Sequence, residues 1–287
     1  MNLALVLSRS GFGIEAPQVT VEVHISPGLP AFNIVGLPET AVKESKDRVR
    51  SALLNAQFDF PSQRITVNLA PADIPKDGSR FDLPIALGIL AASGQIDTLA
   101  LENREFIGEL ALSGELRRVP GSLPVALACQ RAGRELIVPC ANALEVSLAK
   151  SKAFTAEHIL EVTAHLSGQK RLRLVDVQIQ SNIISVPDLA DVQGQHSAKR
   201  ALTIAASGGH NLLFIGPPGT GKTMLASRLP GILPPMTDEE AIASASIKSI
   251  SANGIDLEQW GQRPFRSPHH TASAVALVGG SPKSIII

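Results

Sequence analysis

Tyrosine is absent from this sequence, and Trp260 is its only tryptophan. Because single-stranded nucleic acids are commonly bound by stacking their bases on aromatic side chains, the sequence offers few residues for such a platform. Its two cysteines, Cys129 and Cys140, are too few and too poorly spaced for a zinc site or a disulfide framework. A reducing cytoplasm is therefore the expected compartment.

An excess of charge of either sign is also lacking, since 26 basic residues balance 26 acidic ones. Zero net charge argues against a globally basic protein that coats DNA, although a local basic loop within an oligomer would escape this test. No run of about 18 apolar residues is present, so we expect no membrane helix. The apolar run Leu3–Leu7 has no basic region before it and is not typical of a secretory signal.

What the sequence contains is enough apolar material for buried cores, because 44% of its 287 residues are apolar and only 18% are charged. A length of this order predicts about two domains. The composition changes after Gln169, where a basic KRLRL run precedes a polar stretch. We expect a first domain at residues 1–168, a linker at 169–187 and a second domain at 188–287. A solvated linker is favoured over contact of the basic run with DNA or a neighbouring subunit.

The first half has the mixed periodicity of an α/β domain. Short apolar or alternating segments predict strands at Thr20–Ile25, Ile65–Leu69, Phe106–Leu110 and Glu135–Val138. Apolar residues at helical spacing and helix-stop signals predict helices at about Glu39–Gln57, Asp82–Ala92, Pro124–Arg131 and Thr155–Ser167. Asp82 can cap its helix, and Gly94 is a natural stop.

The second half carries the phosphate-binding motif G-x-x-x-x-G-K-[ST]. The expected context is a helix at Gln195–Ala206, a short buried strand at Leu212–Ile215, the glycine-rich turn, and a helix from Lys222 onward. Glycines permit positive φ, so that successive N–H groups point into one anion-binding nest, and the following helix adds partial positive charge. This pattern predicts that ATP is bound by Gly216, Pro217, Pro218, Gly219, Thr220, Gly221, Lys222 and Thr223.

Two side chains of this loop have predicted roles. Lys222 would reach the β- and γ-phosphates as a mobile point charge, and Thr223 would offer its hydroxyl to Mg²⁺. A chain of this length matches the pattern by chance about once in a hundred sequences. The flanking strand and helix make an accidental glycine-rich turn the weaker interpretation.

Longer segments resemble one family. Asp191–Leu202 resembles the box that covers the adenine in AAA+ ATPases, and Arg263–Gly280 resembles a signature of their magnesium-chelatase-like branch. Three segments of the first half closely resemble the N-terminal domain of the ComM/YifB family: Thr20–Leu53, Asn68–Leu87 and Ile107–Gly121. The resemblance covers nearly the whole chain, to about Gly280.

This resemblance implies a Lon-protease-like (ribosomal protein S5 domain 2-like) α/β domain followed by an incomplete P-loop AAA+ α/β domain. It also implies a hexameric, ATP- and Mg²⁺-dependent DNA helicase that drives branch migration in natural transformation and recombination, with branched or single-stranded DNA as its partner. The alternative is a chelatase-like chaperone ATPase that remodels protein partners. The Lon-like domain favours the helicase, whereas composition and periodicity give no sign of DNA.

The Lon-like segment Pro75–Gly78 raises the question of peptidase activity. By resemblance, the nucleophilic serine falls on Arg80, with Ser79 one residue away, and the lysine base falls near Leu123–Pro124. Neither residue of that pair can accept a proton, so a serine would lack its activating base. We expect an interaction and assembly domain without peptidase activity.

The segment near the end of the sequence carries histidines and arginines of open role. His269 and His270 are adjacent, point in different directions and have no third ligand at suitable spacing, so a structural or oligomer-contact role is favoured over zinc binding. Arg263 and Arg266 would face DNA in a central pore, a neighbouring subunit or solvent.

The acids that hydrolysis requires are not in the expected context. In this family a strand ends in Asp-Glu, where Asp orders Mg²⁺ and Glu activates water. None of the acids after Thr223 follows four apolar residues: Asp238, Glu239, Glu240, Asp256 and Glu258. We therefore expect no catalytic acid in this chain, an ATPase pattern that stops before the acid-bearing strand, and negligible hydrolysis.

Overall fold

The computed structural model describes residues 2–76, 78–176, 187–251, 254–256 and 260–268. The chain forms two compact units. One, called the N-terminal unit, contains Met1–Ile179 and Ala245–Ile255; the other, called the C-terminal unit, contains Gln180–Ser244 and Asp256–Ile287. The domain boundaries expected at residues 168 and 187 stay predictions.

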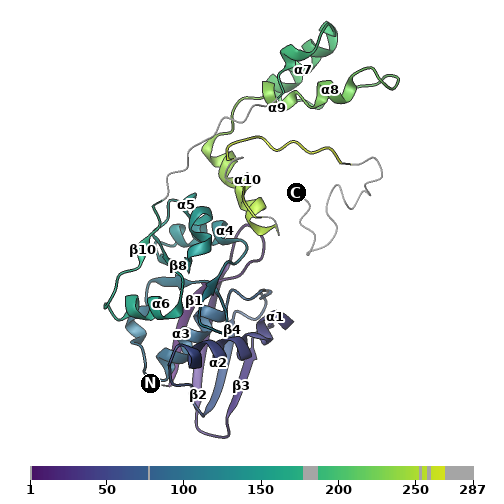
Figure 1. Ribbon diagram of the computed structural model, residues 1–287. Coiled ribbons are helices and arrows are strands. Elements are labelled where there is room, and N and C mark those ends of the chain that lie inside the picture. Colours follow the sequence, from purple (N-terminus) through teal and green to yellow (C-terminus); the bar gives the residue numbers. More distant parts are fainter. Residues whose placement is uncertain (1, 77, 177–186, 252–253, 257–259, 269–287) are drawn as a thin grey trace. The chain divides into compact units, whose positions relative to one another are not determined.

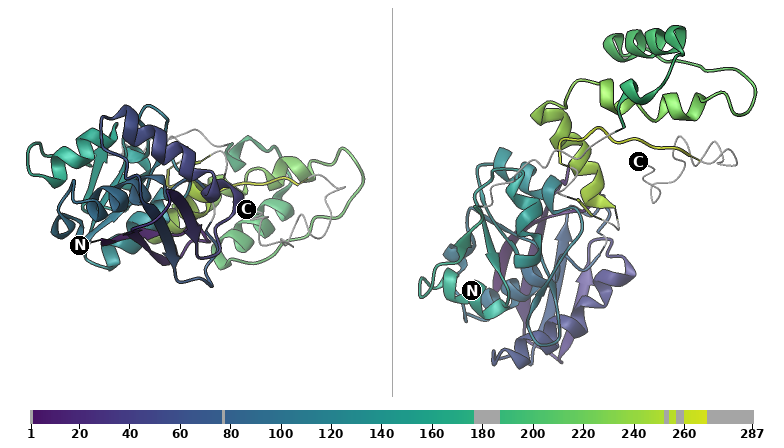
Figure 2. Two further views of the ribbon diagram at one scale, coloured as in Figure 1. Left: turned by 90° about the horizontal axis from the view of Figure 1, so that it is seen from below. Right: turned by 45° about the horizontal axis from the view of Figure 1, so that its top comes forward.

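A mixed sheet of eight strands forms the centre of the N-terminal unit, in the order β10-β9-β8-β5-β1-β2-β4-β3 (Figures 1 and 2). The strands are β1 (Leu3–Arg9), β2 (Gln18–Ser26), β3 (Ala31–Val35), β4 (Arg64–Ala70), β5 (Arg104–Phe106), β8 (Glu135–Pro139), β9 (Ala153–Ala156) and β10 (Arg173–Leu174). Strand β1 pairs antiparallel with β2 and parallel with β5, so it joins an antiparallel part to a parallel part. A separate hairpin consists of β6 (Glu109–Leu110) and β7 (Leu116–Arg117).

One face of β1, β2 and β4 is buried, and buried positions alternate with more exposed ones along most of each strand. In β2 and β4 the buried positions are all apolar. Helix α3 (Asp82–Ala92) lies against β1 and β2 and is buried along its whole length. Helix α2 (Ser45–Asn55), which follows the short α1 (Thr40–Lys43), packs beside α3. A Cβ added at Gly88 of α3 would lie 2.5 Å from Val23 Cγ2, so the absence of a side chain there sets how closely the helix approaches the sheet.

Several sequence predictions are confirmed in this unit. The strands expected at Thr20–Ile25, Ile65–Leu69 and Glu135–Val138 lie in β2, β4 and β8, and Gly94 ends α3 with φ +78°. The remaining helices of the unit are α4 (Ser122–Arg131), α5 (Ala143–Ser147) and α6 (Ile159–Leu166).

Other predictions require correction. Asp82 is not the N-cap of α3; that residue is Phe81, and the buried Asp82 carboxylate instead accepts hydrogen bonds from Ser45 and Arg48 of α2. The helix expected at Thr155–Ser167 starts only at Ile159, because Thr155 belongs to β9, which pairs with β8. The strand expected at Phe106–Leu110 is divided between β5 and β6.

The second half of α10 (Asp238–Ile250) also belongs to the N-terminal unit. Ser249 is fully buried, its carbonyl accepts from Gly121 N at 2.8 Å, and its hydroxyl accepts from Leu123 N at 3.4 Å. The same hydroxyl donates to the carboxylate of Glu145. Gly121 gives α4 no side-chain cap, so Ser249 provides hydrogen-bond partners that this helix start otherwise lacks.

The C-terminal unit consists of helices and loops over its described residues. These helices are α7 (His196–Gly208), α8 (Lys222–Ala226), α9 (Leu229–Ile232) and the first half of α10, with a 3-10 turn at Leu189–Asp191. Thr237 and Glu240 form a capping box at the start of α10: Thr237 N lies 3.0 Å from Glu240 Oε2, and Glu240 N lies 3.2 Å from Thr237 Oγ1. The helices expected at Gln195–Ala206 and from Lys222 onward are confirmed.

Candidate nucleotide-binding site

The loop Gly216–Gly221 leads directly into α8, as its motif predicts. Gly219 and Gly221 both have φ of +82°, a left-handed conformation that side chains other than glycine adopt at a cost. Thr220 Oγ1 donates to the Pro217 carbonyl at 2.9 Å and closes the loop on itself. The glycines of the motif therefore lie where the backbone turn requires them.

The Lys222 ammonium lies over this loop. It donates to the carbonyl oxygens of Gly216 at 2.9 Å and Pro217 at 2.7 Å, and it lies 3.5 Å from Thr220 Oγ1. Since an ammonium group has three donors and no acceptor, the loop oxygens supply hydrogen-bond acceptors for it. Thr223, the next residue, is exposed.

The strand expected at Leu212–Ile215 is wrong for this structure. The segment forms no strand, and Leu213 and Ile215 are 79% and 87% exposed. A parallel strand forms only where neighbouring strands accept and donate its backbone hydrogen bonds. No strand is present among the described residues of the C-terminal unit, so this segment has no partner there.

The segment that resembles an adenine cover forms an ion pair with Arg228, the N-cap of α9. Val192 is buried, and Arg228 Nη2 lies 4.0 Å from Asp191 Oδ2. Arg228 also donates to the Met224 carbonyl at 2.9 Å. The sequence did not predict a role for Arg228, because no motif in the neighbouring residues distinguishes it from other arginines of the chain.

Residues of open role near the end of the sequence are described only in part. Arg263 binds within its own unit: Nε donates to the Pro234 carbonyl at 2.8 Å, and Nη2 lies 3.0 Å from Glu240 Oε2. Arg266 is exposed, whereas His269 and His270 lie outside the described residues.

Three of the acids after Thr223 begin a helix, whereas Asp256 lies outside any helix or strand. Asp238, Glu239 and Glu240 form the first turn of α10, where negative charge is favoured. The N–H of Thr237 and, after it, the guanidinium of Arg263 lower the pKa of Glu240 below its usual value. Glu258 lies outside the described residues. Among the residues that are described, no group of three His, Cys, Asp or Glu side chains could hold a metal ion.

In the segment that resembles a Lon peptidase, the group that contacts the serine is a carboxylate rather than the Lon-type lysine. The hydroxyl of Ser79 donates to the carboxylate of Glu109. Arg80, at the position of the nucleophile, is buried, with Nη2 2.8 Å from the Pro120 carbonyl. Lys76 is also buried; its ammonium donates to the carbonyl of Pro71, and burial lowers its pKa.

Comparison with known proteins agrees with both halves of this description. A family model described as subunit ChlI of Mg-chelatase matches residues 21–142, and a second, described as magnesium chelatase subunit ChlI, matches residues 188–285. The chain is 57% identical over 286 residues to the competence protein ComM of Haemophilus influenzae, and that match covers 98% of this chain. The chain belongs to the ComM/YifB family.

Other members of the ComM/YifB family extend the comparison. The uncharacterized protein YifB of Escherichia coli is 51% identical and an uncharacterized protein of Mycobacterium tuberculosis is 39% identical, each over 98% of this chain. The chain spans 56% of the length of each of these relatives. This family is magnesium-chelatase-like and of the AAA+ type, and its α/β architecture agrees with the fold described above. None of the helices in the described residues is both long and apolar enough to cross a bilayer.

Proposed function

We propose that this chain supplies the nucleotide-binding part of an ATP-driven ring motor, a branch-migration helicase that acts on branched or single-stranded DNA in natural transformation and recombination. The observation that carries the proposal is the loop whose carbonyls hold the Lys222 ammonium at 2.7 and 2.9 Å. Such a lysine can exchange carbonyl partners for the β- and γ-phosphate oxygens of ATP. Thr223 would then hold Mg²⁺ through its hydroxyl.

The chemical groups of this loop are suited to binding ATP with Mg²⁺. Gly219 and Gly221 leave room for close backbone approach, and Lys222 supplies positive charge. Asp191 and Arg228 link the adenine box to the start of α9, the helix after α8. Bound ATP with Mg²⁺ would supply the phosphoryl group whose hydrolysis drives the motor.

Assembly, substrate and location are proposed from the family. The Haemophilus influenzae relative is named a competence protein, and competence involves uptake of DNA. We therefore assign a homo-hexamer, DNA as partner and the cytoplasm as compartment. The N-terminal unit would serve interaction and assembly, without peptidase activity.

We also propose that the chain alone binds ATP without turning it over. Hydrolysis needs a carboxylate that activates water. Glu240 instead completes the capping box of α10 and binds Arg263, and Asp238 and Glu239 share its helix start.

Binding of a fluorescent ATP analogue to the whole chain tests the site. Lys222→Ala is expected to weaken binding by at least about tenfold, because it removes the charge aimed at the phosphates. Thr223→Ala should reduce the effect of Mg²⁺ more than binding itself. The matched control is Lys170→Ala, which removes a 72% exposed ammonium of the N-terminal unit. Equal binding by Lys222→Ala and Lys170→Ala would contradict the proposal.

Steady-state phosphate release distinguishes the motor from the alternative, a chelatase-like chaperone that remodels proteins. A full-length relative is expected to hydrolyse ATP faster when branched DNA is added, whereas this chain should release little phosphate. Turnover of the relative that does not respond to DNA would favour the chaperone. Equal, Lys222-dependent turnover by both proteins would refute the claim that this chain lacks its catalytic acid.

A further inference from the structure

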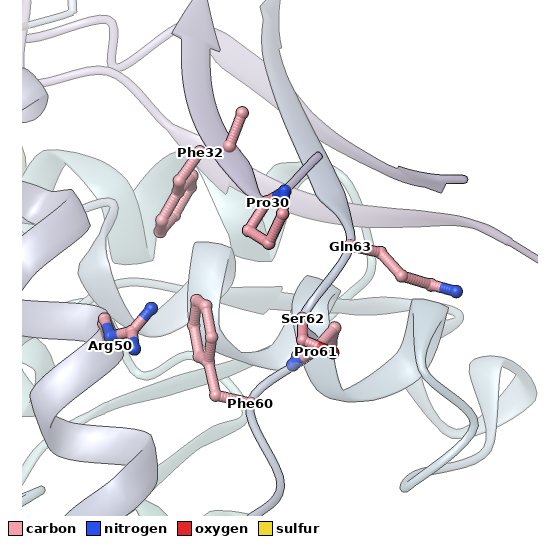
Figure 3. Close-up of a pocket in the computed structure, with 8 residues that line it drawn as sticks. Pro30, Phe32, Arg50, Phe60, Pro61, Ser62 and Gln63 are labelled. Carbon is pink, nitrogen blue, oxygen red and sulfur yellow. The ribbon is translucent and has the colours of Figure 1, made fainter. Parts of the chain in front are cut away.

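A pocket of about 320 Å³ opens at the start of β3, within the N-terminal unit and on elements that have no part in the nucleotide-binding loop. Its lining comes from Pro30–Phe32 at the start of β3, from Arg50 of α2 and from Phe60–Gln63 before β4. Figure 3 shows Phe32 and Phe60 directed toward one another, with Arg50 beside Phe60. Pockets of this size commonly hold a small ligand.

Aromatic rings form the walls of this pocket. The ring centres of Phe32 and Phe60 lie 6.1 Å apart with an angle of 43° between their planes, and both side chains are half-buried. Arg50 Cζ lies 5.0 Å from the centre of the Phe60 ring, at cation–π distance. A sequence with no tyrosine and one tryptophan thus brings two of its nine phenylalanines together beside an arginine.

The charge at the pocket is positive. Arg50 is exposed and makes no ion pair within the part of the chain that the structure describes, and no acidic residue lines the pocket. Lys46 lies one turn earlier on α2, and Arg64 follows Gln63 directly. The nearest acids in sequence, Asp47 and Asp59, do not contribute to the lining. An exposed guanidinium beside an aromatic ring suits a ligand that combines a flat ring with a negative group.

We propose that this pocket binds one nucleotide of single-stranded DNA, with the base stacked on Phe60 and Phe32 and the phosphate against Arg50. Ser62 and Gln63 can form hydrogen bonds with the edge of a base without selecting a sequence. A proline-rich peptide is a less suitable ligand, because the lining of this pocket contains no Tyr hydroxyl or Trp N–H that could bind peptide carbonyls. The choice of DNA rests on the proposed function, whereas the pocket does not depend on nucleotide at Lys222.

The test measures fluorescence anisotropy of a labelled oligothymidylate of about 20 nucleotides with the whole chain, in the absence of ATP. Arg50→Glu and Phe60→Leu are each expected to weaken binding by about tenfold, which corresponds to the loss of one stacked base or one charged contact. Arg131→Glu, on the exposed end of α4, changes the net charge equally and is the matched control. Phe60→Leu keeps an apolar side chain at a half-buried position, so the unit should stay folded.

A second measurement reports on the pocket alone. In a Trp260→Phe background, Phe60→Trp should keep the affinity, and its fluorescence should be quenched by oligothymidylate but not by an abasic strand of the same charge. Equal affinity of Phe60→Leu, Arg50→Glu and Arg131→Glu, or absence of quenching, would overturn the inference. Quenching by a proline-rich peptide and not by DNA would overturn it in favour of a peptide site. Failure of ATP binding at Lys222 refutes the proposed function and leaves these readouts unchanged.

Discussion

Arg9 and Glu105 form a two-point ion pair in the N-terminal unit, although 96 positions separate them in the chain. Arg9 Nε lies 2.6 Å from Oε2 and Nη2 lies 2.8 Å from Oε1, while Arg134 Nη1 lies 2.9 Å from Oε1. The Glu105 side chain is fully buried. These bonds hold β1 to β5, at the junction between the antiparallel and parallel parts of the sheet.

Removal of one partner of this ion pair should therefore destabilise the folded protein. Arg9→Ala is expected to lower the free energy of unfolding by about 3–5 kcal/mol, because Glu105 would keep a buried charge with one partner fewer. Urea denaturation followed by circular dichroism measures the change. In the control, Arg117→Ala, the lost partner is Glu109 at 3.8 Å, and the arginine is 65% exposed, so a loss of about 0–1 kcal/mol is expected. Similar losses in both variants would contradict the assigned role of Arg9.

The close approach of α3 to β2 leads to a second prediction, which concerns stability. Gly88→Ala improves helix propensity, yet its Cβ would lie 2.5 Å from Val23 Cγ2, so we expect a net destabilisation of about 1–3 kcal/mol. Val23→Ala removes the opposing methyl group, and the double variant should lose less stability than the sum of the two single variants. Additivity within about 0.5 kcal/mol in this cycle would show that the two positions do not clash.

The two thiols should differ sharply in reactivity. Burial raises the pKa of Cys129 to about 12, with the Glu105 charge adding to the shift, whereas Cys140 is exposed. Because the thiolate is the reactive form, Cys129 should stay inert between about pH 7 and 9. A disulfide reagent at pH 8 is expected to modify one thiol of the native chain and both after unfolding. In Cys140→Ser, rapid modification of the native protein would refute this.

Ser79 is expected to be unreactive toward serine-directed phosphonates. Its hydroxyl donates to the Glu109 carboxylate, and the position of the Lon-type lysine is held by the fully buried Leu123. The lysine that would take the proton of a Lon-type serine is therefore missing from its position. Mass spectrometry after labelling provides the measurement. A phosphonate adduct that disappears in Ser79→Ala would establish peptidase-like chemistry.

Local sequence patterns predicted those helices and strands in which the order of apolar and polar residues matches the burial of each position. Val21 and Val23 alternate with polar residues and lie in β2, and the apolar segment from Asp82 to Ala92 is a buried helix. Strand β3 was not predicted, because Ala31–Val35 is an edge strand whose pairing with β4 is set by tertiary contacts rather than by periodicity.

The candidate site was predicted to a similar extent. The glycines at 219 and 221 and the position of Lys222 as the first residue of α8 follow from one motif. The strand expected at Leu212–Ile215 did not follow, because strand formation depends on distant partners that a local pattern cannot supply. The ion pair of Asp191 with Arg228 could not be predicted either, because it joins residues that are distant in the sequence. Likewise, the pocket at Phe32, Phe60 and Arg50 combines three segments of the chain.

The membership of Ala245–Ile255 in the N-terminal unit imposes an order on its folding. During synthesis the last strand of the sheet, β10, leaves the ribosome before the segment Gln180–Ser244, and Ser249 emerges later still. Until then, water must satisfy the N–H groups of Gly121 and Leu123 that Ser249 binds in the finished unit. If translation pauses before Ser249, all strands of the sheet have already been synthesised. The first turn of α4 then still lacks the hydrogen-bond acceptors that Ser249 provides.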